Sequence, residues 1–88
     1  MSYALRMDNR PALRRAIAVA GSQTKLAAKL GIRQPSIAEW LARNTVPIDR
    51  CTMIETLTGV RCEDLRPDVY WSRGPDGKVM AYTVPVAA

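Results

Sequence analysis

The segment LAAKLGIRQPSIAEWLAR (residues 26–43) restricts the fold of this chain more than any other, because it spaces small, flexible and bulky residues at fixed intervals. Ala27 comes four residues before Gly31, and Ile37 and Trp40 follow the glycine. A small residue lets a second helix cross close to the first, and glycine adopts the left-handed backbone that ends a helix sharply. The spacing therefore predicts two short helices joined by a tight turn, a helix-turn-helix.

Helical patterns continue on both sides of this unit. Asp8 and Asn9 are candidate N-caps of a helix that has Pro11 in its first turn. Ser22 is a candidate cap for the next helix, and Pro47 begins a later one. The expected helices cover residues 12–20, 23–30, 34–43 and 47–58, with a short helical turn within 62–68.

The C-terminal part changes character, because the β-rich runs VYWSR and KVMAYTV flank the sequence GPDG. Proline presets φ and glycine accepts a positive φ, so this sequence favours a turn. We expect a β-hairpin over about residues 69–84 that packs on the helices, pairs with another chain, or does both, because a lone hairpin is marginal in water. The predicted fold is mainly α: a Cro-like helix-turn-helix bundle of four to five short helices with a C-terminal β-hairpin. We predict one compact domain, in which residues 1–68 bind DNA and 69–88 form the hairpin and tail.

The residue totals narrow the class of protein. A chain of 88 residues is expected to form one domain. It has no 18-residue apolar run and no apolar signal segment at its start, so we expect a cytoplasmic protein. Two cysteines without CxxC spacing, and no histidine, favour free buried thiols over a zinc site, although the spacing leaves a disulfide open. Without histidine the common nucleophile–base pairs cannot form, so we expect no enzyme activity, cofactor or small-molecule substrate.

The charge is unevenly distributed along the chain. Residues 1–50 contain nine Lys and Arg against three acidic residues, whereas residues 51–88 contain four against five. A basic first half favours a polyanion partner at the predicted helix-turn-helix. The charge alone is equally consistent with a solvated basic surface.

These motifs carry a family resemblance. Residues 22–43 resemble the helix-turn-helix of the Cro-like phage repressor superfamily. Together, GSQTKLAAKLGIRQPSIAEWL and DRCTMIETLTGVRCEDLRPDVYW resemble the YdaS-like group of prophage regulators, which are often labelled antitoxins. The likeness covers about residues 11–71 and leaves the tail uncovered. It implies a compact fold of about five helices, operator binding with two-fold symmetry and repression of prophage genes.

The predicted DNA contacts lie on both helices of the motif, around a structural core of Ala27, Gly31, Ile37 and Trp40. The resemblance implies that Gln23 contacts phosphate and braces the recognition helix. Gln34 has the groups to pair with adenine, and Glu39 either accepts from cytosine or pairs with Arg43. The predicted DNA-binding residues are Gln23, Thr24, Lys25, Arg33, Gln34, Pro35, Ser36, Glu39, Arg43, Asn44 and Thr45.

One copy of so small a protein reads too few base pairs to find a unique site, so we expect a homodimer with recognition helices about 34 Å apart on a palindromic operator. The hairpin is the candidate dimer contact, and core packing is the alternative use of its apolar residues. A rival hypothesis is an antitoxin-like module that binds a toxin or another protein, with DNA binding secondary. The candidate dimerisation residues are Tyr70, Trp71, Val79, Met80, Tyr82 and Val84.

Overall fold

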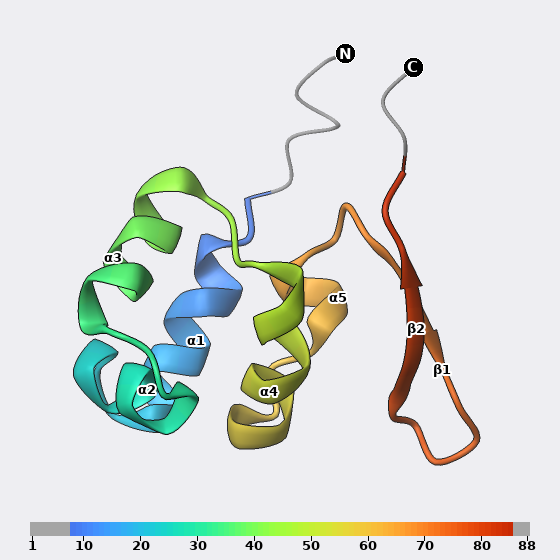
Figure 1. Ribbon diagram of the computed structural model, residues 1–88, viewed down its shortest axis with the longest axis horizontal. Coiled ribbons are helices and arrows are strands. Elements are labelled where there is room, and N and C mark those ends of the chain that lie inside the picture. Colours follow the sequence, from blue (N-terminus) through green and yellow to red (C-terminus); the bar gives the residue numbers. More distant parts are fainter. Residues whose placement is uncertain (1–7, 86–88) are drawn as a thin grey trace.

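The computed structural model describes residues 8–85 and confirms a mainly helical fold (Figure 1). In this part of the chain five helices precede a two-stranded antiparallel sheet. The ends of the two predicted regions, residues 1–7 and 86–88, lie outside the described residues. The elements are α1 (Arg10–Ala20), α2 (Gln23–Leu30), α3 (Gln34–Arg43), α4 (Ile48–Thr58), α5 (Cys62–Leu65), β1 (Tyr70–Arg73) and β2 (Val79–Thr83).

Local chemistry sets the limits of α2. The Ser22 hydroxyl accepts a hydrogen bond from the Lys25 backbone N–H at 3.1 Å and caps the first turn. Gly31 adopts φ 72° at the end of the helix. This conformation lets the N–H of Ile32 bond to the Ala27 carbonyl at 2.9 Å, which satisfies a carbonyl that the helix leaves open. Both residues act as the sequence predicted.

Of the two N-cap candidates at the start of α1, Asp8 and Asn9, only Asp8 bonds to the first turn through its side chain. Asn9 occupies the N-cap position, but its side chain makes no capping hydrogen bond. The Oδ1 atom of Asp8 accepts from the Arg10 backbone N–H instead, at 3.0 Å. The Asn9 side chain is 5% exposed and donates to the Leu65 carbonyl. A buried amide needs a hydrogen-bond partner, and the Asn9 side chain bonds to this carbonyl, 56 positions away in the sequence, and not to the first turn of α1.

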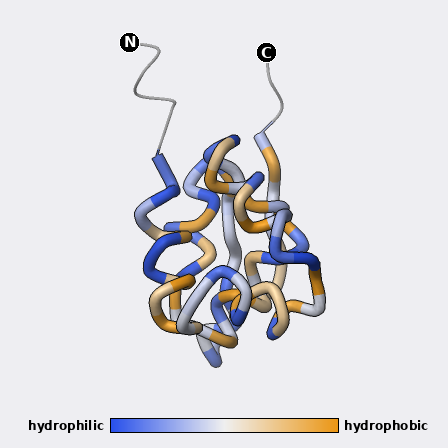
Figure 2. Tube along the Cα trace, turned by 90° about the vertical axis from the view of Figure 1, so that its left-hand side faces the viewer, coloured by the Kyte–Doolittle hydropathy of each residue, from blue (hydrophilic) through white to orange (hydrophobic). Residues whose placement is uncertain are grey.

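All five helices contribute to one apolar core. Figure 2 views the molecule from the side of α2 and α3, and hydrophobic and hydrophilic stretches alternate along the helical turns. Burying a Leu or Ile side chain stabilises the fold by roughly 1.5–3 kcal/mol each. The largest fully buried side chains are Leu13, Leu26, Ile37, Ile54, Leu65, Val46, Cys51 and Cys62. No helix within residues 8–85 is long and apolar enough to cross a membrane.

The predicted hairpin is present. Strands β1 and β2 pair antiparallel with Trp71 opposite Tyr82, whose ring centroids are 5.7 Å apart. An irregularity in the register lies between Ser72 and Arg73. At the turn, the N–H of Gly77 bonds to the Gly74 carbonyl at 2.9 Å, and Gly77 takes the positive φ that the GPDG sequence anticipated.

The hairpin is fixed to the helices by charge and by packing. The Arg73 guanidinium bonds to Glu55 of α4 and to Glu63 of α5, with shortest distances of 2.5 and 2.7 Å. Trp71 and Val79 pack against the helical core. Of the alternatives predicted for the hairpin, packing on the helices is confirmed. These two side chains, which we had grouped with the dimerisation residues, are therefore largely used within the chain.

Candidate nucleic-acid interface

The surface of α3 divides into a buried and an exposed face. Ile37 and Trp40 belong to the core, as predicted. Two small residues, Ala38 and Ala42, also lie on the exposed face and were not among the predicted contacts. Gln34, Ala38 and Ala42 follow one another at intervals of four residues, a spacing that places them on one face of a helix. Small side chains let a helix lie close to the floor of a groove. The exposed residues of α3 are Gln34, Pro35, Ala38, Glu39, Ala42 and Arg43.

A side-chain hydrogen bond joins the first turns of α2 and α3. The Nε2 atom of Gln34 donates to Oε1 of Gln23 over 3.0 Å. Both amides keep free hydrogen-bonding capacity, because each amide group offers two donors and an accepting oxygen. Gln23 is half-buried and Gln34 is exposed. The pair places two polar groups side by side where the two helices begin.

The first turn of α2 suits an anion. Thr24 and Lys25 are exposed there, and the turn contains no acidic residue. The positive end of the helix dipole and unpaired backbone N–H groups favour negative charge at such a terminus. The geometry at this end of α2 is therefore compatible with a phosphate contact.

Positive charge remains uncompensated on the helix-turn-helix. Lys25, Lys29 and Arg33 form no ion pair with any residue between 8 and 85. By contrast, the C-terminal arginines Arg66 and Arg73 each pair with acidic side chains. The basic first half of the sequence thus presents unpaired cations on the helix-turn-helix, where a polyanion can bind them.

Glu39 and Arg43 form the i,i+4 ion pair that was one of the two roles expected for Glu39. Their charged atoms are 3.2 Å apart, and both side chains are more than half exposed. Such an exposed helical pair contributes only about 0.3–0.5 kcal/mol. The pair orders both side chains on the exposed face. Because the pair is weak, either side chain can leave it for another partner at little cost in free energy.

The remaining predicted residues lie at the flanks of α3. Arg33 is exposed at the N-cap position of α3, and Ser36 is half-buried in its first turn. Asn44 caps the other end in the left-handed conformation, with φ 55°. Its Oδ1 atom accepts from the Asn9 backbone N–H at 3.0 Å, so the structure gives this side chain an intramolecular role. Thr45 is half-buried beside it.

The cysteines do not belong to this surface. Cys51 and Cys62 are buried and free. Burial raises the pKa of each thiol to about 12, which keeps both protonated and unreactive near neutral pH. Within the described residues no three His, Cys, Asp or Glu side chains are grouped to hold a metal ion.

The chain is similar in sequence and in fold to known proteins. The family described as "Bacterial toxin YdaS" matches residues 13–74, which include the helices from Leu13 onward and the first strand. A protein of Escherichia coli (strain K12), "Putative transcriptional regulator YdaS", is 42% identical over 62 residues. That alignment covers 67% of this chain and 63% of the relative's length.

A solved structure shares the fold. Its title is "Structure of the Cro protein from putative prophage element Xfaso 1 in Xylella fastidiosa strain Ann-1", and it superposes with a TM-score of 0.67 at 46% sequence identity. The match covers 75% of this chain and all of that one. The Cro-like fold predicted from the sequence is confirmed.

Proposed function

The chain belongs to the YdaS family, and on that basis we propose that it is a sequence-specific regulator of transcription that binds double-stranded DNA. The observation that carries the proposal is the exposed face of α3, which presents Gln34 at its start while Ile37 and Trp40 fix the opposite face in the core. A helix held in this way presents side chains to base edges in a major groove. The names of the relative and of the Cro structure support a regulator.

The two helices would divide the work. The first turn of α2, with Gln23, Thr24 and Lys25, would hold phosphate and set the register of the protein on the duplex. Arg33 and the exposed face of α3 as far as Glu39 would read base edges, with Gln34 as the candidate partner of adenine. Arg43 and Thr45 would meet the backbone where α3 ends. The function proposed is binding rather than catalysis.

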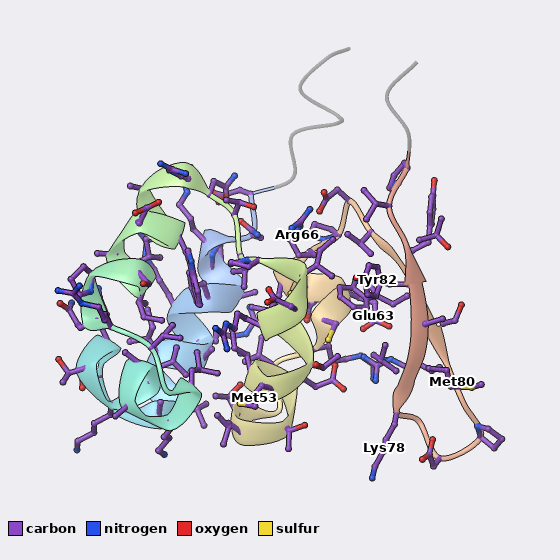
Figure 3. The ribbon with its side chains drawn as sticks, in the orientation of Figure 1. Met53, Glu63, Arg66, Lys78, Met80 and Tyr82 are labelled. Carbon is purple, nitrogen blue, oxygen red and sulfur yellow. The ribbon has the colours of Figure 1, made fainter. Side chains whose placement is uncertain are left out.

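We further propose that two copies bind a palindromic operator as a homodimer through the hairpin. Figure 3 shows Met80 on the side of the hairpin turned away from the helices and Tyr82 on the side turned toward them. The exposed fractions of Tyr70 and Met80 are 69% and 72%. Val84 is also exposed, so apolar surface outside the core is available to a second copy. The hairpin thereby acts as a dimerisation arm on the helix-turn-helix domain.

A second candidate function uses the same exposed residues. The family description names a toxin, and an antitoxin-like or toxin-related module would bind another protein through the hairpin, with DNA binding secondary. Co-purification of an untagged, genetically neighbouring protein with the full chain would favour this alternative.

The proposal is tested by selecting bound duplexes from a random-sequence DNA library. Enrichment of one common sequence at near-physiological salt would support the regulator, because non-specific electrostatic binding does not distinguish sequences. Equal recovery of all sequences would reject it.

A further inference from the structure

The loop that follows α3, residues 44–47, is held from outside the helix-turn-helix. The carbonyl of Val46 in this loop accepts a hydrogen bond from Nη1 of Arg66 at 2.9 Å. Arg66 comes directly after α5, 20 positions later in the chain. Val46 is fully buried, so its carbonyl has no access to water and depends on this donor.

Arg66 is itself immobilised by two further contacts. Its Nε and Nη2 atoms bond to the two carboxylate oxygens of Asp68, at 2.9 and 2.8 Å, which is a bidentate pair. This pairing fixes the plane of the guanidinium and directs its third nitrogen at Val46. The backbone carbonyl of Arg66 accepts from Nε1 of Trp71 at 3.0 Å. Arg66 thus contacts the hairpin through its backbone carbonyl and the end of α3 through its side chain, which is 16% exposed.

Asn9 also contacts this loop. Its backbone N–H bonds to Oδ1 of Asn44, the residue that caps α3, and its side chain donates to the carbonyl of Leu65 in α5. The sequence separations are 35 and 56 residues. Two segments outside the motif, the start of α1 and the end of α5, therefore meet at the C-terminal end of α3.

We propose that Arg66 and Asn9 are positioning residues that fix the C-terminal end of α3 and thereby set the angle at which this helix enters DNA. The inference rests on the proposed function. Ile37 and Trp40 pack the middle of α3 into the core, the Gln34–Gln23 bond ties its start to α2, and the contacts of Arg66 and Asn9 hold its far end. Loss of the end contacts lets the last turn of α3 shift relative to its packed middle, which displaces the exposed side chains from base edges while the phosphate contacts of α2 persist.

The test compares Arg66→Gln with Arg61→Gln in the full-length protein. Both substitutions remove one positive charge from the region of α5, so long-range attraction to DNA falls equally. Arg61 is exposed and its partner is Glu63, at 3.6 Å. One readout is the ratio of affinities for the selected operator and a scrambled duplex at a single salt concentration. The second is amide hydrogen exchange in the protein without DNA.

Arg66→Gln should lower the affinity ratio by roughly two- to thirtyfold, the range expected for residues that act through a packed network. Arg61→Gln should leave it unchanged. Exchange should quicken at Asn44 and Thr45, whose N–H groups bond to Leu41 and Trp40, and stay unchanged in α2. Equal ratios for the two variants would overturn the proposal, as would faster exchange spread evenly over the chain, which indicates general destabilisation.

A milder variant keeps the test valid if Arg66→Gln does not fold. Arg66→Lys retains the charge and the aliphatic stem but cannot bond to Asp68 bidentately and to Val46 together, so an intermediate affinity ratio is expected. If the unmodified protein prefers no duplex, the proposed function fails and the DNA part of this inference fails with it. The exchange pattern at residues 44–46 still shows separately whether Arg66 holds the end of α3.

Discussion

Gln34 donates a side-chain hydrogen bond to Gln23 across the turn of the helix-turn-helix, with 3.0 Å between the two atoms. The residues are 11 positions apart, and each lies in the first turn of its helix. The bond couples the residue proposed to hold phosphate to the residue proposed to read a base. The proposed contacts of these two residues with DNA should therefore be coupled.

The Gln23–Gln34 bond predicts that the two side chains are not independent in DNA binding. In a double-mutant cycle of Gln23→Ala and Gln34→Ala, the affinities for the selected operator should show a coupling of about 0.5–1 kcal/mol. Fluorescence anisotropy with labelled operator measures all four proteins. Strictly additive losses would mean that the bond plays no part in the complex.

Lys25 is predicted to act on phosphate alone. Lys25→Ala should weaken binding to all duplexes alike and reduce the slope of log affinity against log salt by about 1. Lys78→Ala is the matched control, because Lys78 is also an exposed lysine but lies at the hairpin turn. The measurement is a salt titration of both variants on two unrelated duplexes. An identical salt slope for the two variants would remove Lys25 from the interface.

Much of the fold could be predicted because its signals are local. Ser22 caps a helix through an N–H three positions away, and Gly31 ends that helix by its own backbone conformation. The turn at Gly77 likewise depends on adjacent residues. Periodicity placed Ile37 and Trp40 in the core, since a buried face repeats along a helix. The same periodicity places Ala38 and Ala42 on the exposed face of α3.

The contacts that could not be predicted join residues distant in the sequence. Nothing near Asn9 indicates a partner at Leu65, and nothing near Arg73 indicates Glu55 rather than another acidic residue. Such pairings depend on how the helices pack in three dimensions, which local propensity does not contain. They also define how the hairpin packs on the helices, because Arg73, Trp71 and Val79 anchor it there, whereas the sequence predicted the packing without its partners.

The Arg73 cluster predicts a specific loss of stability in acid. Hydrogen bonds from Arg73 lower the pKa of Glu55 and of Glu63 to about 2, from 4.5 in the absence of interactions. A carboxyl group with a lowered folded-state pKa contributes stability that is fully present above its unfolded pKa. That contribution should decline as the pH falls from about 4.5 to about 2. Urea unfolding across this window measures it.

Arg73→Met provides the comparison for that experiment. It should cost about 1–3 kcal/mol of unfolding free energy at neutral pH, between the values for exposed and buried ion pairs, and should flatten the decline in acid. Arg15→Met is the control, since its pair with Asp64 is exposed and 3.4 Å long. An unchanged pH dependence in Arg73→Met would show that the cluster does not stabilise the fold.

The proposed dimer predicts that the outer surface of the hairpin controls oligomeric state. Tyr70→Ser combined with Met80→Ser should weaken self-association roughly tenfold or more, because apolar area buried between copies is lost. Substitution is preferable to deleting the strands, which would also remove Arg73 and Val79 from their intramolecular contacts. Met53→Ser, at an exposed methionine of α4, is the control. Unaltered sedimentation of the double variant would exclude the hairpin surface as the dimer contact.

The most direct test of sequence-specific recognition by α3 is parallel selection from a random DNA library with the unmodified protein and with Gln34→Ala. The unmodified protein should enrich an inverted repeat whose half-sites lie about one helical turn apart. Gln34→Ala should enrich the same repeat with one or two positions in each half-site degenerate, a loss of roughly 1–3 kcal/mol of discrimination at each. No enriched sequence for the unmodified protein, with binding that disappears as salt rises, would contradict the account.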